Sequence, residues 1–155
     1  MFNLNIRAIG KLTEPWLRQG VDMYVDRIKP LAKIQVIELA EGQKGSAKPD
    51  MERTRASEAQ NLQKGLVSGS LIVALDQTGK QFDSPALAKL LQEHSDRPLT
   101  FLIGGSWGLE AEILKKSDLV LSLGKLTLPH SLARLVLAEQ LYRALMINAG
   151  RAYHK

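Results

Sequence analysis

Apolar runs with the spacing of strands alternate with helical segments along the whole chain, and this alternation limits its fold more than any other feature. Strands are expected at residues 2–9, 34–39, 71–75, 99–103 and 119–123. Helices are expected near residues 14–27, 50–67, 85–94, 109–115 and 131–147. Strands that alternate with helices form a mostly parallel sheet with helices on its faces. We therefore predict an α/β fold.

The size and composition of the chain exclude several classes of protein. A length of 155 residues predicts one domain, residues 1–155, which is small for an enzyme acting alone on a large substrate, so a second copy is expected. The absence of cysteine excludes disulfides and thiolate chemistry, and no spacing typical of metal ligands is present. No apolar stretch approaches the length of a membrane span, so a soluble, cytoplasmic protein is expected.

The net charge of +5 is compatible with a polyanionic partner and equally with an ordinary basic protein. The Gly-, Lys- and Ser-rich connection at residues 40–49 is interpreted as a solvated surface loop or, alternatively, as a loop that contacts RNA. A further local signal is Ser84-Pro85, which predicts a helix start with Ser84 as the capping residue.

Three strand ends share a character that indicates a binding site. Ligands of open parallel sheets lie beyond the carboxyl ends of the strands. Here those ends carry the segments LDQTGK (residues 75–80), IGGSWG (103–108) and LGKLTLP (123–129). The glycines allow a close approach of backbone to a ligand, although glycine turns also follow strands for structural reasons alone. The last segment is nearly uncharged and predicts a pocket wall or a partner contact.

The helix after this segment is apolar almost all round, which favours burial between two subunits. Arg134 projects into its larger apolar arc, where an unpaired charge is costly, so either a carboxylate or an anionic ligand is expected beside it. His130 at the head of the helix and His154 in the tail are candidate proton carriers, or histidines with no special role.

Several motifs together resemble the SPOUT superfamily of methyltransferases, and within it the ribosomal RNA large subunit methyltransferase H family. They are IGGSWGL at residues 103–109, LTLPHSLARLVLAEQLYRA at 126–144 and the ending AYHK, with RAIGK, LDQTGK and the Ser-Pro helix start occurring in order before them. The resemblance covers the whole length. Ser106-Trp107 stands where Pro-Glu is expected in many relatives, and Lys155 where arginine is common.

The resemblance implies a trefoil knot at the C-terminus, a homodimer and S-adenosylmethionine as the cofactor. The cofactor site maps onto the strand-end segments, at Leu75, Gly105, Gly124, Lys125, Leu126, Thr127, Leu128 and Pro129. The implied reaction methylates N3 of a pseudouridine in the helix 69 region of 23S ribosomal RNA on the assembled ribosome.

Because N3 carries a proton at neutral pH, a proton acceptor is needed. His154 is the candidate base, with water as an equal alternative. Tyr153, Arg134 and Lys155 are candidates for orienting the target base or balancing its charge, and His130 is a candidate substrate contact. RNA is expected to contact the cationic residues Lys44, Lys48, Arg53 and Arg55 together with the tail.

Three alternatives stay open. The first is a SPOUT methyltransferase with another RNA target, such as a tRNA. The second is a non-catalytic ribosome-associated binding protein that has kept the pocket. The third is a flavodoxin-like domain that binds a small molecule.

Overall fold

The computed structural model describes residues 1–43, 45–48 and 50–155, and these form a five-stranded parallel sheet. The strands are β1 (Phe2–Ile9), β2 (Ala32–Leu39), β3 (Leu71–Gln81), β4 (Leu99–Ile103) and β5 (Leu119–Ser122). Their order across the sheet is β2-β1-β4-β3-β5, and every neighbouring pair is parallel. The predicted α/β fold is confirmed.

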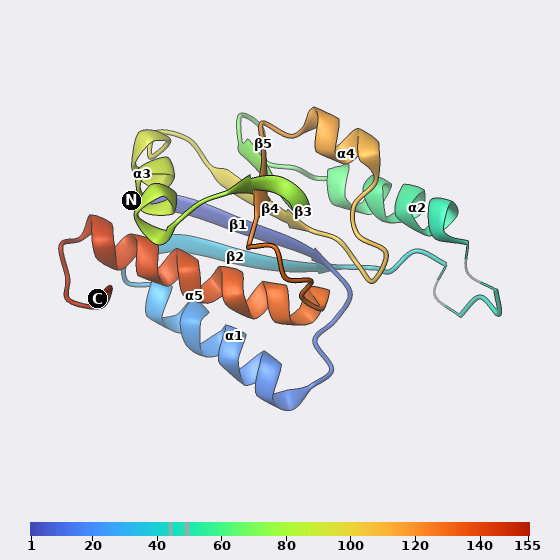
Figure 1. Cartoon of the computed structure of the whole chain (residues 1–155), viewed down its shortest axis with the longest axis horizontal. Coiled ribbons are helices and arrows are strands. Elements are labelled where there is room, and N and C mark those ends of the chain that lie inside the picture. Colours follow the sequence, from blue (N-terminus) through green and yellow to red (C-terminus); the bar gives the residue numbers. More distant parts are fainter. Residues whose placement is uncertain (44, 49) are drawn as a thin grey trace.

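Helices cover both faces of the sheet (Figure 1). The described helices are α1 (Pro15–Ile28), α2 (Met51–Gln63), α3 (Ser84–Glu93), α4 (Ala111–Lys116) and α5 (His130–Asn148). Side chains of α1, α3 and α5 share one core cluster with the sheet, and those of α2 and α4 share a second cluster. None of these helices is long and apolar enough to cross a lipid bilayer.

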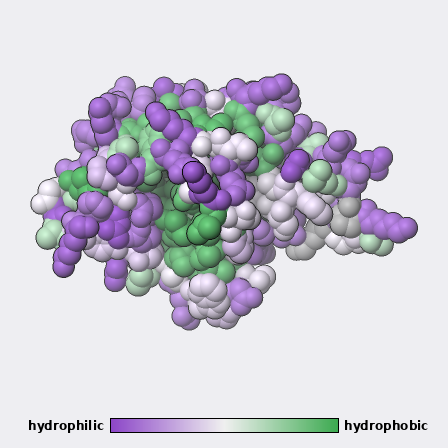
Figure 2. Space-filling view, in the orientation of Figure 1, coloured by the Kyte–Doolittle hydropathy of each residue, from purple (hydrophilic) through white to green (hydrophobic). Residues whose placement is uncertain are grey.

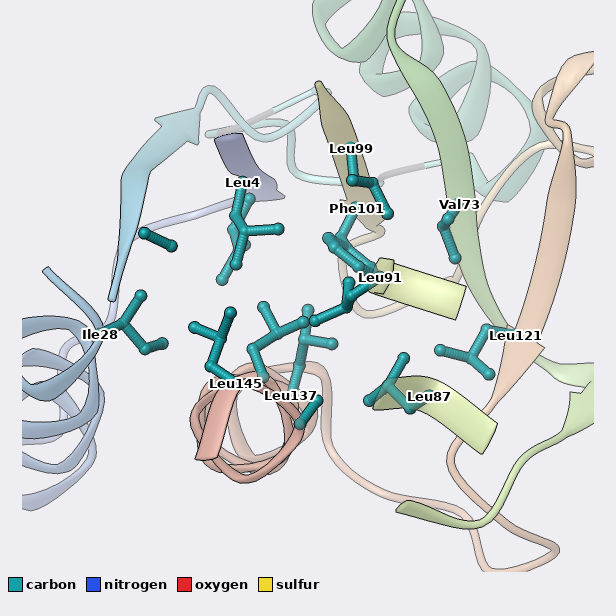
Figure 3. Close-up of a cluster of buried hydrophobic side chains, with 14 of the residues drawn as sticks. Leu4, Ile28, Val73, Leu87, Leu91, Leu99, Phe101, Leu121, Leu137 and Leu145 are labelled. Atoms are coloured by element: carbon teal, nitrogen blue, oxygen red, sulfur yellow. The ribbon is translucent and has the colours of Figure 1, made fainter. Parts of the chain in front are cut away.

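The larger core lies between the sheet and α5 (Figure 3). Leu4 and Phe101 of the sheet face Leu137 and Leu145 of α5, and Leu91 of α3 closes the cluster from the side. Each of these side chains is no more than 2% exposed. Burial of an apolar side chain of this size contributes about 1.5–3 kcal/mol, so this cluster fixes α5 against the sheet.

The start of α3 differs from the sequence-based expectation. Asp83, rather than Ser84, is the N-cap, and its carboxylate accepts a hydrogen bond from the Ala86 N–H at 2.8 Å. Ser84 instead donates its hydroxyl to Gln140 of α5 at 2.6 Å. A carboxylate at the N-cap also interacts favourably with the helix dipole, and Pro85 keeps the predicted place in the first turn.

β3 is longer than predicted, because the segment that was expected to be a loop after residue 75 continues the strand. Both Leu75 and Lys80 pair with Leu121 of β5, so residues 76–79 bulge out between them. At Gly79 the chain passes so close to β5 that a Cβ atom would lie 2.6 Å from the Val120 carbonyl oxygen. Only glycine fits this approach, and it allows the strand to resume after the bulge.

A second correction concerns α2, which ends at Gln63 instead of near residue 67. Lys64 leaves the helical conformation, and Gly65 follows with a φ of +78°. The trefoil knot implied by the resemblance stays a prediction.

The C-terminus of α2 is held by an arginine that lies in the sheet. Arg7 of β1 is 4% exposed, and its guanidinium donates to the carbonyl groups of Leu62, at 3.1 Å, and Asn61, at 3.1 Å, and also to that of Lys64. These carbonyls have no partner within the helix and form the negative end of its dipole. The arginine thus satisfies groups that burial would otherwise leave unpaired, and burial lowers its pKa.

Replacing Arg7 with methionine keeps the apolar volume but leaves these carbonyls without a donor. We expect Arg7→Met to lower the free energy of unfolding by about 3 kcal/mol, measured by urea denaturation. Arg97→Met is the matched control, because Arg97 donates to the Gly69 carbonyl at an exposed site and its loss leaves that carbonyl to water. Equal losses for the two variants would contradict this role of Arg7.

Candidate functional site

A cavity of about 760 Å³ lies at the carboxyl ends of β3, β4 and β5, and the first turn of α5 closes one side of it. It is lined by residues 75–77, 103–106, 108, 121, 123, 124, 126–130 and 133. The three strand ends that were singled out in the sequence therefore meet in one place. A parallel sheet brings them together, because the carboxyl ends of its strands share one edge.

Most of the predicted cofactor-binding residues line this cavity. Seven of them do so: Leu75, Gly105, Gly124, Leu126, Thr127, Leu128 and Pro129. Lys125 is not among the lining residues, and its side chain is exposed. The cavity is mainly apolar, and Asp76 is the one Asp, Glu, Lys or Arg residue among the described residues that line it. Such a site suits a ligand that combines a flat apolar ring with a cationic group.

Asp76 and Gln77, on the bulge of β3, belong to the LDQTGK segment, but the sequence did not indicate a role for either residue individually. The Asp76 carboxylate accepts a hydrogen bond from the Thr78 N–H at 3.0 Å, which fixes its orientation. Gln77 reaches across to the loop before α5, where its amide donates to the Lys125 carbonyl at 2.9 Å and to the Thr127 hydroxyl at 3.1 Å. Gln77 thus ties two walls of the cavity together.

A buried carboxyl group packs against Gly105, one of the glycines that line the cavity. Glu58 of α2 is 4% exposed, and one of its oxygens, Oε2, accepts the Gly42 N–H at 3.1 Å. A Cβ atom on Gly105 would lie 2.9 Å from Oε2 and 3.0 Å from Oε1, so a larger residue at this position would force the Glu58 carboxyl group to move. Within the described residues Oε1 is buried without a hydrogen-bond partner.

Burial raises the pKa of Glu58 above its ordinary value, the Gly42 hydrogen bond opposes the shift, and the charge of Glu41 adds to it. The sequence does carry a signal for this residue. Glu58 shares the buried face of α2 with Thr54, Ala59 and Leu62, so an acidic residue interrupts a stripe at helical spacing.

The sequence left two alternative partners for Arg134, a carboxylate or an anionic ligand. In the structure the partner is the carboxylate of Glu38. The side chain is 2% exposed, its Nη1 donates to Glu38 Oε2 at 2.6 Å, and its Nη2 donates to the Gly10 carbonyl at 2.9 Å. Hydrogen bonds from the Leu12 N–H and from Arg134 and Arg18 lower the pKa of Glu38 although burial opposes this. Arg134 does not line the cavity and instead supports the end of β1. Its expected contact with the substrate stays a prediction.

His130 lines the cavity, as expected for a residue that contacts a ligand. Burial lowers its pKa, the nearby Arg134 lowers it further, and Glu41 opposes the shift. The ring is therefore neutral near pH 7, and its unprotonated nitrogen is able to accept a hydrogen bond or a proton.

The tail residues lie away from the cavity of the chain. Tyr153 donates its hydroxyl to Glu139 at 3.1 Å and packs edge-on against Tyr142 with ring centroids 4.8 Å apart. His154 Nδ1 lies 3.3 Å from Arg143 Nη1. These contacts hold the tail on the second half of α5, whereas the cavity adjoins the first turn of that helix, at the other end (Figure 1). Lys155 is exposed and does not line the cavity.

The residues expected to contact RNA lie at the start of α2 and before it. Lys48 and Arg53 are exposed, and the Arg55 Nε donates to the Trp107 carbonyl at 2.7 Å. Lys44 lies outside the described residues. The described residues contain no group of three or more His, Asp or Glu side chains that could hold a metal ion.

Comparison with known proteins places the whole chain in one family. The family described as "Predicted SPOUT methyltransferase" matches residues 2–154. A protein of Ligilactobacillus salivarius named Ribosomal RNA large subunit methyltransferase H is 39% identical over 159 residues, covering 99% of each chain. The protein of the same name from Carboxydothermus hydrogenoformans is 36% identical over 157 residues, covering 98% of this chain and 99% of that one.

The fold is also found in a solved structure. A probable methylase family protein from Haemophilus influenzae superposes with a TM-score of 0.56 over 99% of this chain and 71% of that chain, at 15% sequence identity.

The raised pKa of Glu58 predicts a pH-dependent change in stability. Between the ordinary value near 4.5 and the higher native value, the folded chain binds more protons than the unfolded chain, so this residue makes stability fall as pH rises. A glutamine side chain at this position cannot ionise. We therefore expect the Tm of Glu58→Gln, relative to wild type, to increase from pH 5 to pH 8 in thermal unfolding followed by circular dichroism.

Glu52→Gln serves as the control, because Glu52 is exposed in the first turn of the same helix. If the Tm difference between Glu58→Gln and wild type stays constant across this pH range, ionisation of Glu58 does not destabilise the fold, and the prediction is wrong.

Proposed function

The chain belongs to the SPOUT methyltransferase family, and we propose that it transfers the methyl group of S-adenosylmethionine to N3 of a pseudouridine in 23S ribosomal RNA. The proposed target lies in the helix 69 region of the assembled ribosome, in the cytoplasm, and residues 1–155 act as one SPOUT methyltransferase domain. The single observation that carries the proposal is the similarity to ribosomal RNA large subunit methyltransferase H proteins over nearly the full length of both chains.

The cavity supports S-adenosylmethionine as the cofactor. Its loop at residues 123–129, where Lys125 is the one charged residue and does not line the cavity, suits an adenine ring, and backbone groups of such a loop are able to read the edge of the ring. Asp76 supplies a carboxylate for a cationic group, and the absence of a side chain at Gly105 leaves room against Glu58. We propose that Leu75, Gly105, Gly124 and residues 126–129 hold the cofactor.

When bound, this cofactor supplies a methyl group that its sulfonium already activates. The chain then has to place the target base in line and exclude water. Gln77 does part of this work by holding the loop before α5 in place through Lys125 and Thr127. His130 borders the same cavity and offers a neutral ring nitrogen toward the base.

The proton on N3 needs an acceptor, and we propose His154 or a water molecule for this role. Burial raises the pKa of Tyr153 to about 12, with further contributions from Tyr24 and Glu139. Tyr153 therefore stays protonated near neutral pH and acts as a hydrogen-bond donor. Lys155 adds a positive charge at the end of the tail to balance negative charge that develops on the base.

We propose a homodimer in which the tail of one protomer completes the cavity of the other. Every residue of α5 is buried or half-buried in the single chain, and apolar residues lie on all sides of this helix. Figure 2 shows hydrophobic surface gathered in a band over the middle of this face, where β5, the following loop and α5 lie in Figure 1. Leu126 in that loop is 82% exposed. An apolar band of this kind is typical of a subunit interface.

RNA binding is proposed for the cationic residues at the start of α2, namely Lys48, Arg53 and Arg55, with Lys44 and the tail. Phosphate contacts by such residues position the RNA, and the flipped base gives specificity. Affinity for the ribosome is then expected to fall steeply with salt concentration.

The cofactor assignment is tested with Gly105→Val. The added side chain would collide with Glu58 at the cavity wall. We expect calorimetry to show S-adenosylmethionine binding to the wild type and at least a roughly tenfold weaker affinity for the variant. The matched control is Ser95→Val on an exposed turn. Binding of the cofactor without methyl transfer to ribosomes that lack the modification would favour a non-catalytic ribosome-associated protein over the proposed enzyme.

A complementation assay tests the shared site. If His154 is the proton acceptor, His154→Ala alone is expected to be inactive because it lacks this group, and Gly105→Val alone is expected to be inactive at limiting cofactor because its cavity is blocked. Refolded as an equal mixture, they should recover about a quarter of the wild-type rate, because half of the dimers are mixed and each of these has one intact site. A mixture as inactive as its components would show that each tail serves its own cavity, or that no such dimer forms.

A further inference from the structure

The glycine loop after β4 carries an exposed tryptophan beside the cavity. Residues 105–108 form a tight turn in which the Gly108 N–H donates to the Gly105 carbonyl at 3.0 Å. Gly105, Ser106 and Gly108 line the cavity, whereas the indole of Trp107, between them, is 46% exposed. An exposed large aromatic side chain on a hydrogen-bonded turn at the rim of a binding site is able to serve as a contact for a ligand.

An arginine from another element is joined to this turn. The Nε of Arg55, on α2, donates to the Trp107 carbonyl at 2.7 Å. Within the described part of the chain, the two Nη groups of Arg55 make no hydrogen bond or ion pair. A planar cation with unpaired donors on α2 is therefore hydrogen-bonded to the backbone of the residue that carries the exposed indole.

We propose that Trp107 and Arg55 form a binding site for one nucleotide of the RNA that flanks the methylated base. The indole stacks on the base of that nucleotide, and the Arg55 Nη groups pair with its phosphate. The inference rests on the proposed function and extends it, because it names a contact outside the cavity. Stacking on aromatic side chains and paired hydrogen bonds from guanidinium to phosphate are the general means of binding unpaired nucleotides.

The surroundings favour RNA over a protein partner. Arg53 and Lys48, in and just before the first turn of α2, are exposed and cationic. The position also fits, because a base that enters the cavity has to leave its stack, and its neighbours in the strand then lose a stacking partner at the rim. Many relatives are expected to carry Pro-Glu at positions 106 and 107, where this chain has Ser106-Trp107. The proposed stacking contact is therefore specific to this chain.

Enzyme kinetics on ribosomes that lack the modification provide the first test. Trp107→Ala is expected to raise KM for ribosomes roughly 5- to 100-fold, while kcat at saturation and S-adenosylmethionine affinity stay within about twofold of wild type. Trp107→Phe should recover most of the loss because it restores an aromatic face. Arg55→Gln should also raise KM and make it less dependent on salt.

Trp16→Ala is the matched control. Trp16 is 59% exposed at the start of α1, and neither of its neighbours in the sequence lines the cavity. Its kinetic constants should equal those of the wild type. An unchanged KM for Trp107→Ala, or an equal rise for Trp16→Ala, would overturn the inference.

Fluorescence gives a second readout that does not depend on catalysis. Trp16 and Trp107 are the two tryptophans of the chain, so Trp16→Phe leaves the indole of Trp107 as the only one. Titration with a short unstructured RNA at low salt should quench its emission, and Arg55→Gln should weaken the effect. If the wild type methylates no ribosome while the quenching persists, the proposed function fails and the nucleotide site stands. Methylation without quenching, and with a normal KM for Trp107→Ala, contradicts the nucleotide site alone.

Discussion

Carbonyl groups at the ends of secondary structure elements need donors, and the fold depends on long polar side chains that supply them. Arg7 serves the buried last turn of α2, Arg134 serves the buried end of β1, and Gln77 serves the loop before α5 at an exposed site. A buried carbonyl without a partner costs free energy comparable to a lost hydrogen bond. Each of the three side chains comes from a different segment, so each also fixes one part of the chain relative to another.

Two of these supports lie next to the cavity. Gln77 connects β3 with the loop whose residues form a cavity wall, and Arg134 packs at the head of α5, near His130. Glu58 acts on a third side, where its carboxyl group lies directly against Gly105. Residues that mostly do not line the cavity, but contact the residues that do, therefore determine its shape. This arrangement suits a site whose main task is to position two reactants.

The fold class and the location of the cavity were predictable because they follow from local patterns. Alternation of strands and helices specifies a parallel sheet, and the sheet itself gathers its carboxyl ends, so the sequence predicts that the segments at residues 75–80, 103–108 and 123–129 meet at one edge. The individual cofactor residues among them follow from the family resemblance. Long-range contacts were not predictable in the same way. The continuation of β3 past its bulge depends on pairing with β5. Asp83 is the N-cap of α3 because the Ser84 hydroxyl donates to Gln140 on α5 instead.

The charged residues show the same limit. Arg134 was recognised as a charge in an apolar arc, yet both a carboxylate and a ligand satisfied that pattern, and the partner Glu38 lies 96 residues away in the sequence. Glu58 carried a comparable signal within α2, but its partners, Gly42 and Gly105, belong to two other segments. A helical pattern indicates that a buried charge needs a partner, and only the tertiary structure identifies it.

The position of the tail has the largest consequence for the proposed chemistry. α5 has 19 residues and is about 28 Å long at 1.5 Å per residue, and it separates the cavity at its first turn from Tyr153 and His154 on its second half. Hydrogen bonds and ring contacts hold the tail there, so it does not reach the cavity of its own chain without breaking them. A second copy packed on the apolar band along α5 would bring its own tail to the cavity, and one apolar surface would then account for both the dimer and the complete site.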